Sequence, residues 1–349
     1  MRPWSNAFAA IVVLTTVAPK AGADFTPGHV YVAATSPEGC FLPFYANDRV
    51  WDINPVTGES SILGEVPDEE CGLMRDLDFT PDGTGLRAAE RFTHSVLEFS
   101  ANGNVTVALD NTDGLIQPRN MAYDAQGNFY VDVVSPPRIL KFPAAGGPAT
   151  VFADESDGVF SGGTLAFAPN GDLYYANVLP AQILRFSPDG DGELFDTLLG
   201  AIHGIDTDAQ GHLFALTGAG LYRYDAGDPV SQVLLASGIT IGEVASIAAS
   251  PDSSSVYIAS ANQLVSVDAT SGSLTLLAEV PDDFGGISWF GSGIDVFVPE
   301  PSSLTVVTIA TGWVCLRRRR RVAARSTLTS SVRGRNGAMP PSVAVDSPG

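Results

Sequence analysis

Six polar residues lie near corresponding points of a sequence unit that recurs along the chain, and their types suit acid–base or ligand-binding chemistry. A histidine among them can act as a general base or as a ligand near neutral pH. If the units surround a common axis, these side chains face one another at the mouth of a channel. There they either form a site or hydrogen-bond loop carbonyls. They are Arg75, Asp76, Arg119, Asn120, His203 and Glu243.

A second polar group is the run Asp189, Asp191 and Glu193, whose members are separated by glycines. Ca²⁺ prefers several hard oxygen ligands, so the run resembles part of a calcium loop. Asp-Gly pairs are equally typical of hairpin turns, and both interpretations stay open. The chain contains no Gly-Xaa-Ser-Xaa-Gly, P-loop or His-Glu-Xaa-Xaa-His motif, so it carries none of the catalytic signatures that these motifs mark.

The elements that must position these residues repeat every 40–44 residues. Turn glycines at 83, 127, 171 and 211 are spaced by 44, 44 and 40 residues, and Ser253 follows 42 residues later. Each unit reads as an apolar strand, a tight turn, and a second strand rich in Tyr, Phe and Val, before two more strands. Four strands in a unit of this length are typical of a β-propeller blade.

The third-strand segments number six, which predicts an all-β, six-bladed β-propeller over residues 24–297, with seven blades as the alternative. The segments are residues 49–54, 95–100, 138–143, 182–187, 220–225 and 263–268. We expect residues 285–298 to close the ring as an inner strand of the first blade, with 286–290 aligned on 164–168. Alternatively, residues 24–28 supply that strand, because DFTPG resembles DFTPDG at 78–83.

Two segments carry a resemblance to known propellers. PRNMAYDAQGNFYV at 118–131 and HGIDTDAQGHLFAL at 203–216 resemble NHL repeats and the wider gluconolactonase-like, or senescence-marker, six-bladed propellers. The resemblance covers roughly residues 29–297. It implies a channel site in which such lactonases hold Ca²⁺ or another divalent cation. Asn120 falls where that family has a metal-binding asparagine.

The N-terminal 23 residues have the pattern of a secretory signal peptide. A basic Arg2 precedes an apolar run, and Ala21-Gly22-Ala23 offers the small residues of a cleavage site. The apolar run is shorter than the roughly 20 residues that a membrane-spanning helix needs. We therefore expect an exported protein.

The C-terminal region resembles a PEP-CTERM sorting signal over residues 298–321. Pro299-Glu300-Pro301 precedes an apolar segment and then an arginine cluster. The resemblance implies recognition by an exosortase-type membrane protease in a Gram-negative bacterium, with a transmembrane helix that anchors the chain before processing. A plain stop-transfer anchor is the alternative. We expect residues 322–349 to form a disordered tail. The cluster comprises Arg317, Arg318, Arg319, Arg320 and Arg321.

Cysteine content and charge narrow the functional classes. Cys40 and Cys71 can form a disulfide in an oxidising compartment, the alternative being two free thiols. Residues 24–301 hold nine basic and 38 acidic residues, a net charge of −29, so nucleic-acid binding is not expected.

We expect a cell-surface or extracellular-matrix propeller that acts as a non-catalytic binding or scaffold module. Its expected partner is an extracellular polysaccharide or a surface protein. The alternative is a divalent-metal-dependent lactonase or hydrolase with its site in the central channel.

Overall fold

The structure, a computed structural model, describes residues 24–35, 48–66, 72–160, 162–242, 245–279 and 289–298, with only the backbone at 289–292. The expected signal peptide, the sorting signal beyond Val298, the tail, Glu243 and the Cys40–Cys71 pair lie outside these residues. Within the described part of the chain, no helix is long and apolar enough to cross a membrane.

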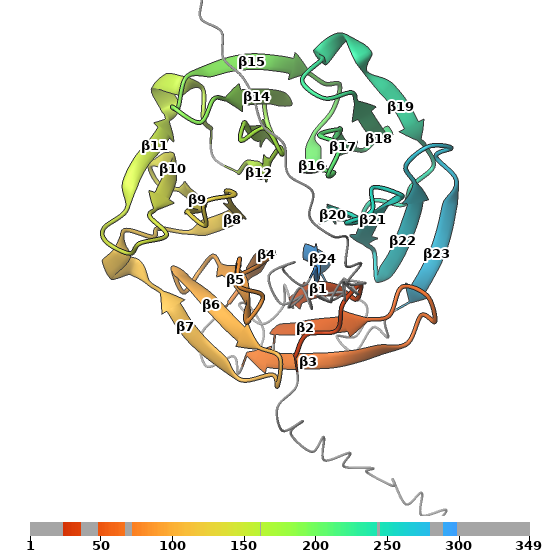
Figure 1. Ribbon diagram of the computed structural model, residues 1–349, viewed down its shortest axis with the longest axis horizontal. Coiled ribbons are helices and arrows are strands. Elements are labelled where there is room, and N and C mark those ends of the chain that lie inside the picture. Colours follow the sequence, from red (N-terminus) through yellow and green to blue (C-terminus); the bar gives the residue numbers. More distant parts are fainter. Residues whose placement is uncertain are drawn as a thin grey trace, which may run out of the picture. The chain divides into compact units, whose positions relative to one another are not determined.

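The described residues form six four-stranded antiparallel sheets, which confirms six blades and excludes the seven-bladed alternative. Figure 1 shows the sheets around a central axis, with β4, β8, β12, β16, β20 and β24 innermost. Blade 1 contains β24 (Trp289–Val296), β1 (Val30–Thr35), β2 (Asp48–Ile53) and β3 (Ser60–Val66). Blade 2 contains β4 (Met74–Phe79), β5 (Gly85–Glu90), β6 (Ser95–Ser100) and β7 (Val105–Leu109). Blade 3 contains β8 (Pro118–Tyr123), β9 (Phe129–Val134), β10 (Pro137–Phe142) and β11 (Thr150–Asp154).

The remaining three blades repeat the pattern. Blade 4 contains β12 (Thr164–Phe167), β13 (Leu173–Asn177), β14 (Gln182–Phe186) and β15 (Gly192–Thr197). Blade 5 contains β16 (Ile202–Thr207), β17 (Leu213–Thr217), β18 (Gly220–Tyr224) and β19 (Val233–Ala236). Blade 6 contains β20 (Ala245–Ala249), β21 (Ser255–Ser260), β22 (Gln263–Asp268) and β23 (Leu274–Glu279). Three short 3₁₀ helices, η1 (Asn111–Asp113), η2 (Glu155–Asp157) and η3 (Pro229–Ser231), also belong to the described residues.

In blades 3 and 5, an aspartate and a glycine with positive φ set the turn between the first two strands. In blade 3, Asp124 Oδ1 accepts hydrogen bonds from the backbone N–H groups of Gln126 (3.0 Å) and Asn128 (2.8 Å). Gly127 takes φ +78°, a conformation that favours glycine because a Cβ is strained there. Ser253 adopts φ 58° at the corresponding point of blade 6. There Asp252 Oδ1 accepts from Ser254 N–H (3.0 Å) and Ser250 Oγ accepts from Ser255 N–H (2.9 Å). Side-chain hydrogen bonds therefore support the turn where glycine is replaced.

Burial changes regularly from the second strand of a blade to the fourth. Every residue of β13 is buried, whereas β15 is mostly exposed and β7 has only exposed and partly buried residues. A second strand packs against neighbouring blades on both faces, which explains its continuous run of apolar and aromatic residues. A fourth strand lies on the outer rim and needs an apolar residue only on its inner face.

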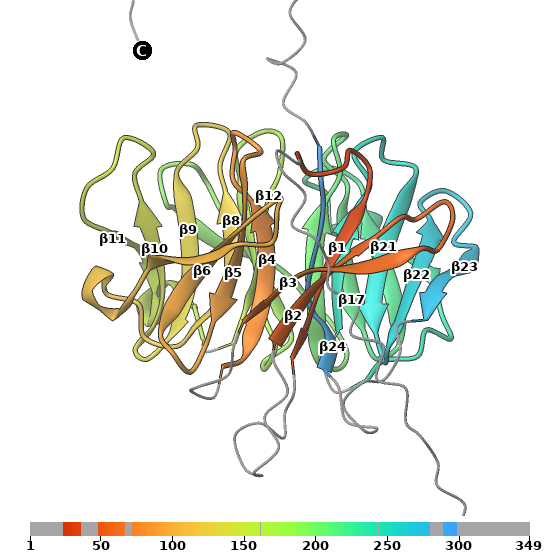
Figure 2. The ribbon, with the colours of Figure 1, turned by 90° about the horizontal axis from the view of Figure 1, so that it is seen from below.

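The ring closes through its C-terminal strand, as the sequence predicts. β24 pairs antiparallel with β1, and Val30 stands opposite Val296; Figure 2 shows the two strands side by side. The predicted alignment of 286–290 with 164–168 is wrong by seven residues, because strand pairing places 293–297 at the position of 164–168. Residues 24–28 form no strand, so the alternative closure is also wrong.

Aromatic packing secures this closure. The Phe25 ring lies 5.5 Å from Tyr31, 4.9 Å from Phe79 and 5.6 Å from Phe297, measured between centroids. Gly28 N–H donates to Phe297 O (3.0 Å), and Phe297 N–H donates to His29 O (3.1 Å). Residues from both ends of the propeller are thus joined at one corner of blades 1 and 2.

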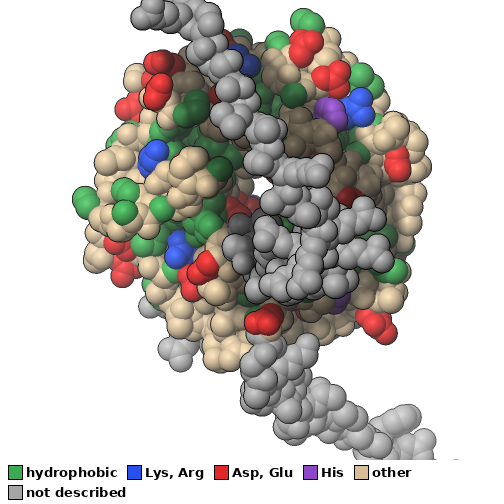
Figure 3. Space-filling model, in the orientation of Figure 1, with side chains coloured by type: hydrophobic (Ala, Val, Ile, Leu, Met, Phe, Trp, Pro, Cys, Tyr) green, Lys and Arg blue, Asp and Glu red, His purple; other side chains and the backbone are tan. Residues whose placement is uncertain are grey.

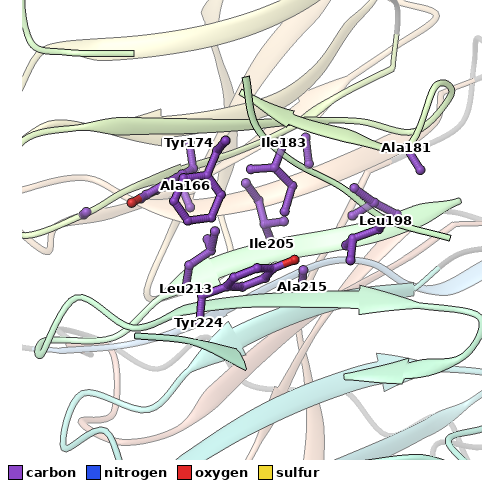
Figure 4. Packing of buried hydrophobic residues seen from close by; sticks show 13 residues of the cluster. Ala166, Tyr174, Ala181, Ile183, Leu198, Ile205, Leu213, Ala215 and Tyr224 are labelled. Atoms are coloured by element: carbon purple, nitrogen blue, oxygen red, sulfur yellow. The ribbon is translucent and has the colours of Figure 1, made fainter. Parts of the chain in front are cut away.

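The hydrophobic core is divided among the interfaces between blades. The cluster between blades 4 and 5 packs Tyr174 and Ile183 against Ile205, Leu213 and Tyr224 (Figure 4). Comparable clusters occupy the other five interfaces. Apolar burial therefore holds the blades in a ring, and the polar side chains of the inner strands are left facing the axis.

Candidate functional site

A cavity of about 390 Å³ lies on the central axis and is lined by residues from the innermost strands of all six blades. Figure 3 shows an opening near the middle of the molecule with acidic side chains beside it. The lining includes five of the six residues that the sequence assigns to a channel mouth, namely Arg75, Asp76, Arg119, Asn120 and His203. The sixth, Glu243, lies outside the described residues. Their roles as ligand-binding groups stay predictions.

The strand register reveals a second ring of positions deeper in the channel. The inner strands of blades 2, 5 and 1 carry an aspartate at this position, namely Asp78, Asp206 and Asp295. Each pairs with a residue of the adjacent second strand, in the same order Arg87, Phe214 and Tyr31. The corresponding residues of the other blades are Ala122, Ala166 and Ala248. Blades 1, 2 and 5 therefore place a carboxyl group at a position where blades 3, 4 and 6 have a methyl group.

The three aspartates of this ring hydrogen-bond to the inner strand of the next blade. Asp295 Oδ2 accepts from Phe79 N–H (2.9 Å), and Asp206 Oδ2 accepts from Ala249 N–H (2.6 Å). Asp78 accepts from Tyr123 N–H. Inner strands of adjacent blades do not form a continuous sheet, so these bonds satisfy backbone donors that would otherwise face the channel.

Polar residues nearer the mouth make similar links. Asp76 Oδ2 accepts from Met121 N–H (2.8 Å), and Asn120 Nδ2 donates to Gly163 O (2.5 Å). Thr207, next to the deeper ring, donates its hydroxyl to Phe167 O (2.6 Å). Together the links join blade 1 to 2, 2 to 3, 3 to 4, 4 to 5 and 5 to 6.

Burial raises the pKa of the channel carboxyl groups. The pKa of Asp206 rises to about 6, and that of Asp295 to about 7, chiefly because burial penalises the charged form. The pKa values of Asp76 and Asp78 are raised well above the ordinary value, again mainly by burial. Asp78 and Asp295 hydrogen-bond to each other, which requires a proton on one of them.

The mouth of the channel has the opposite electrostatic character. Burial, together with the charges of Arg119 and Arg91, lowers the pKa of Arg75 to about 9. The pKa of Arg119 is also lowered, first by burial, while the nearby Asp132 opposes the change. Burial lowers the pKa of His203, so its imidazole is neutral at pH 7. Arginines thus gather above a group of carboxyl groups within one channel.

The other candidate metal ligands are not brought to the channel. Asp189, Asp191 and Glu193 lie exposed at the hairpin between β14 and β15, where Glu193 pairs with Arg185. Ser187 Oγ accepts from Asp191 N–H (3.2 Å), an interaction that supports the turn. Across the described ranges, no group of three or more His, Cys, Asp or Glu side chains is placed to hold a metal ion.

The sequence prediction misses Asp78, Asp206 and Asp295. A signal for them exists, because LDF, IDT and IDV place aspartate where MAY, LAF and IAA place alanine. An aspartate inside an apolar inner strand needs a buried partner. Without the register of the closing strand, Asp295 could not be aligned with the other two.

Comparisons with known proteins agree on the architecture. No protein-family model and no curated protein matches the chain. A chain in the crystal structure of a nidogen/laminin complex has a TM-score of 0.62 at 16% identity, covering 78% of this chain and 98% of that one. A protein of unknown function from Bacteroides caccae has a TM-score of 0.55 at 16% identity, with 76% and 98% covered.

An enzyme appears among the similar structures as well. A catalytically inactive variant of virginiamycin B lyase from Staphylococcus aureus, crystallised with quinupristin, has a TM-score of 0.50 at 13% identity. The match covers 73% of this chain and 86% of the lyase. At these identities the likeness concerns the fold, which hosts both binding proteins and enzymes. The chain is therefore a six-bladed β-propeller whose fold resembles a chain of the nidogen/laminin complex and virginiamycin B lyase.

Proposed function

We propose that this protein is a non-catalytic binding or scaffold propeller that acts at the cell surface or in the extracellular matrix. The observation that carries the proposal is the use of the channel's polar groups. Asp76, Asp78, Asp206 and Asp295 accept backbone hydrogen bonds from the next blade, and Asn120 donates one. Groups fixed in this way hold the ring together, which favours a rigid platform for a partner.

The alternative lactonase function draws less support from the channel. Its expected ligand Asn120 uses its amide N–H to reach Gly163, and the described residues offer no cluster of further metal ligands. A rigid propeller face suits a protein partner, and one of the similar structures comes from a nidogen/laminin complex.

The place of action is proposed from the two ends of the sequence. The first 23 residues have the pattern of an export signal, and residues 298–321 resemble a PEP-CTERM signal. On this proposal, an exosortase-type protease processes the chain after export, and the arginine cluster is removed. The remaining acidic propeller is then released to the surface.

Metal content and hydrolysis test the non-catalytic assignment. The purified protein would be dialysed against Ca²⁺ or Mg²⁺, desalted and analysed for bound metal, then assayed on a panel of lactones. We expect no stoichiometric metal and no hydrolysis. One tightly held ion per chain that is lost in Asn120→Ala, together with lactone hydrolysis, would overturn the assignment. Asp189→Ala serves as the matched control, because Asp189 lies away from the channel.

Mass spectrometry of protein recovered from the cell surface tests the proposed cleavage at both ends of the chain. We expect a mature N-terminus at Asp24 and a C-terminus before Arg317. A C-terminus beyond Arg321 in surface-located protein would contradict processing at the sorting signal.

A further inference from the structure

Three arginines gather at one mouth of the channel in an otherwise acidic propeller. Residues 24–301 contain eight arginines, and Arg75, Arg91 and Arg119 lie close enough for their charges to influence one another. Arg75 and Arg119 line the cavity directly. Like charges repel more strongly where they are partly removed from water, so this arrangement is unfavourable for the unliganded protein.

Four of the five other arginines in residues 24–301 are paired with carboxyl groups. Arg49, Arg87, Arg185 and Arg223 each form an ion pair with an acidic side chain. None of the ion pairs identified in the described residues includes Arg91 or Arg119. The buried Nε atoms of Arg91 and Arg119 find no hydrogen-bond acceptor there, a property they share with Arg138. Arg91 Nη2 donates to Gln117 Oε1 (3.4 Å), whereas no hydrogen bond from the Arg119 guanidinium is found among the described residues. Buried donors of this kind favour an acceptor supplied from outside.

The backbone leaves room for the Arg119 guanidinium. A Cβ on Gly162 would fall 2.3 Å from Arg119 Nη1, and Gly162 has φ +97°. Beneath Arg119, the fully buried Asp132 supplies one nearby carboxyl group, whose Oδ1 lies 3.4 Å from the Tyr175 hydroxyl. The negative charge of this carboxyl group acts on Arg119, where the Arg91 guanidinium opposes it. His203, neutral and half-buried on the cavity wall, adds a hydrogen-bonding group.

We propose that this mouth, formed by Arg75, Arg91, Arg119 and His203, binds a single carboxylate that a protein partner inserts as an Asp or Glu side chain. The inference rests on the proposed binding function and names the chemistry of its ligand. Guanidinium groups recognise carboxylates through charge-assisted hydrogen bonds, which are stronger than neutral ones.

The charge around the mouth favours one isolated carboxylate over a polyanion. Asp76, Asp78, Asp206 and Asp295 line the same cavity, and residues 24–301 carry a net charge of −29. A polyuronate chain would place further negative charges against this surface, whereas a projecting peptide loop brings only one. The cavity of about 390 Å³ is large enough for a side chain and part of its backbone.

Two short peptides test the proposal on the full propeller. The probes are Ac-Gly-Asp-Gly-NH₂ and its isosteric neutral counterpart Ac-Gly-Asn-Gly-NH₂, titrated with detection by NMR. We expect the Asp peptide to bind at least about tenfold more tightly, the gain typical of hydrogen bonds to charged groups. Added salt should reduce this difference, because it screens the charges.

Substitution of single arginines tests whether the preference for the Asp peptide depends on the channel mouth. Arg119→Gln should abolish the preference for the Asp peptide, while Arg185→Gln, on the outer side of blade 4, should leave it unchanged. Urea denaturation checks that each variant is folded, and Arg91→Gln replaces Arg119→Gln if the latter fails to fold. Equal binding of the two peptides, no binding of either, or a preference that survives both mouth substitutions would overturn the proposal.

A titration with an acidic oligosaccharide distinguishes a polysaccharide partner from a protein partner. If hexagalacturonate binds more tightly than the Asp peptide and depends on Arg119, the assignment to a protein carboxylate is wrong. Failure of the inference remains distinguishable from failure of the proposed function. Lactone hydrolysis with a bound metal refutes the non-catalytic function, whereas absent peptide binding in an inactive protein refutes only the carboxylate site.

Discussion

The buried Asp206 is expected to make the propeller more stable in mild acid than in mild alkali. Its side chain accepts from Ala249 N–H (2.6 Å) and Thr207 N–H (2.7 Å), yet burial raises its pKa from 3.8 to about 6. Because the folded-state pKa lies above the unfolded value, the stabilisation is fully present below about pH 4. It is lost as the pH rises through about 6.

The size of the effect follows from the pKa change. At about 1.4 kcal/mol per pKa unit, a rise from 3.8 to about 6 amounts to about 3 kcal/mol in the free energy of unfolding. Roughly 1.4 kcal/mol of this falls between about pH 5 and about pH 8, where the acidic chain keeps a large net charge.

Asp206→Asn isolates this contribution. Asparagine retains an oxygen for Ala249 N–H and cannot ionise, so the variant lacks the pH-dependent part. Urea unfolding of both proteins, followed by tryptophan fluorescence across this pH range, gives the difference in unfolding free energy. Titrating groups that do not interact with Asp206 cancel in that difference, which should move by about 1.4 kcal/mol in favour of the variant as the pH rises. Parallel curves for the two proteins, or a change of the opposite sign, would refute the reasoning.

Three further substitutions test the closure and the turns. Gly293→Ala should destabilise the fold by about 1–3 kcal/mol in urea, because its Cβ would lie 2.6 Å from backbone atoms of Asp76 and Leu77. Gly218→Ala, with nothing within 4 Å, is its neutral control. Phe297→Ala should cost about 3–5 kcal/mol, since the ring is 6% exposed and contacts Phe25 and Phe79; a loss as small as that of the exposed Phe92→Ala would contradict the closure model. Hydrogen bonds from Ser254 and Ser250 lower the pKa of Asp252, so its carboxylate stabilises the fold above the ordinary aspartate pKa and loses this effect in acid. Asp252→Asn should therefore destabilise the protein at pH 7 more than at pH 3. Thermal melts at pH 3 and pH 7 measure this effect, and an equal loss at both pH values would count against it.

Much of the architecture follows from local sequence patterns. Apolar runs, the Asp-anchored turns and the repeat spacing predict six four-stranded blades, because strand alternation and turn conformation depend on residues close in the chain. The same repeat places Arg75, Asp76, Arg119, Asn120 and His203 at one end of the inner strands, and the structure places them on a common cavity.

The closing strand shows where local patterns lose their predictive power. The predicted closure by the C-terminal segment is confirmed, but its alignment differs by seven residues. Register is decided by packing between distant segments, here by Phe297 against Phe25 and by the close approach of Gly293 to Asp76. No nearby residue encodes those contacts.

The sequence by itself therefore determined the repeat, the number of blades and the set of polar residues at one channel mouth. Only the tertiary structure decided that Asp78, Asp206 and Asp295 form one ring, and that Arg91 joins Arg75 and Arg119. Blades are separate sheets, so the groups that meet between them depend on how each sheet packs against the next. Burial then changes their chemistry, raising the pKa values of the carboxyl groups and lowering those of Arg75 and Arg119.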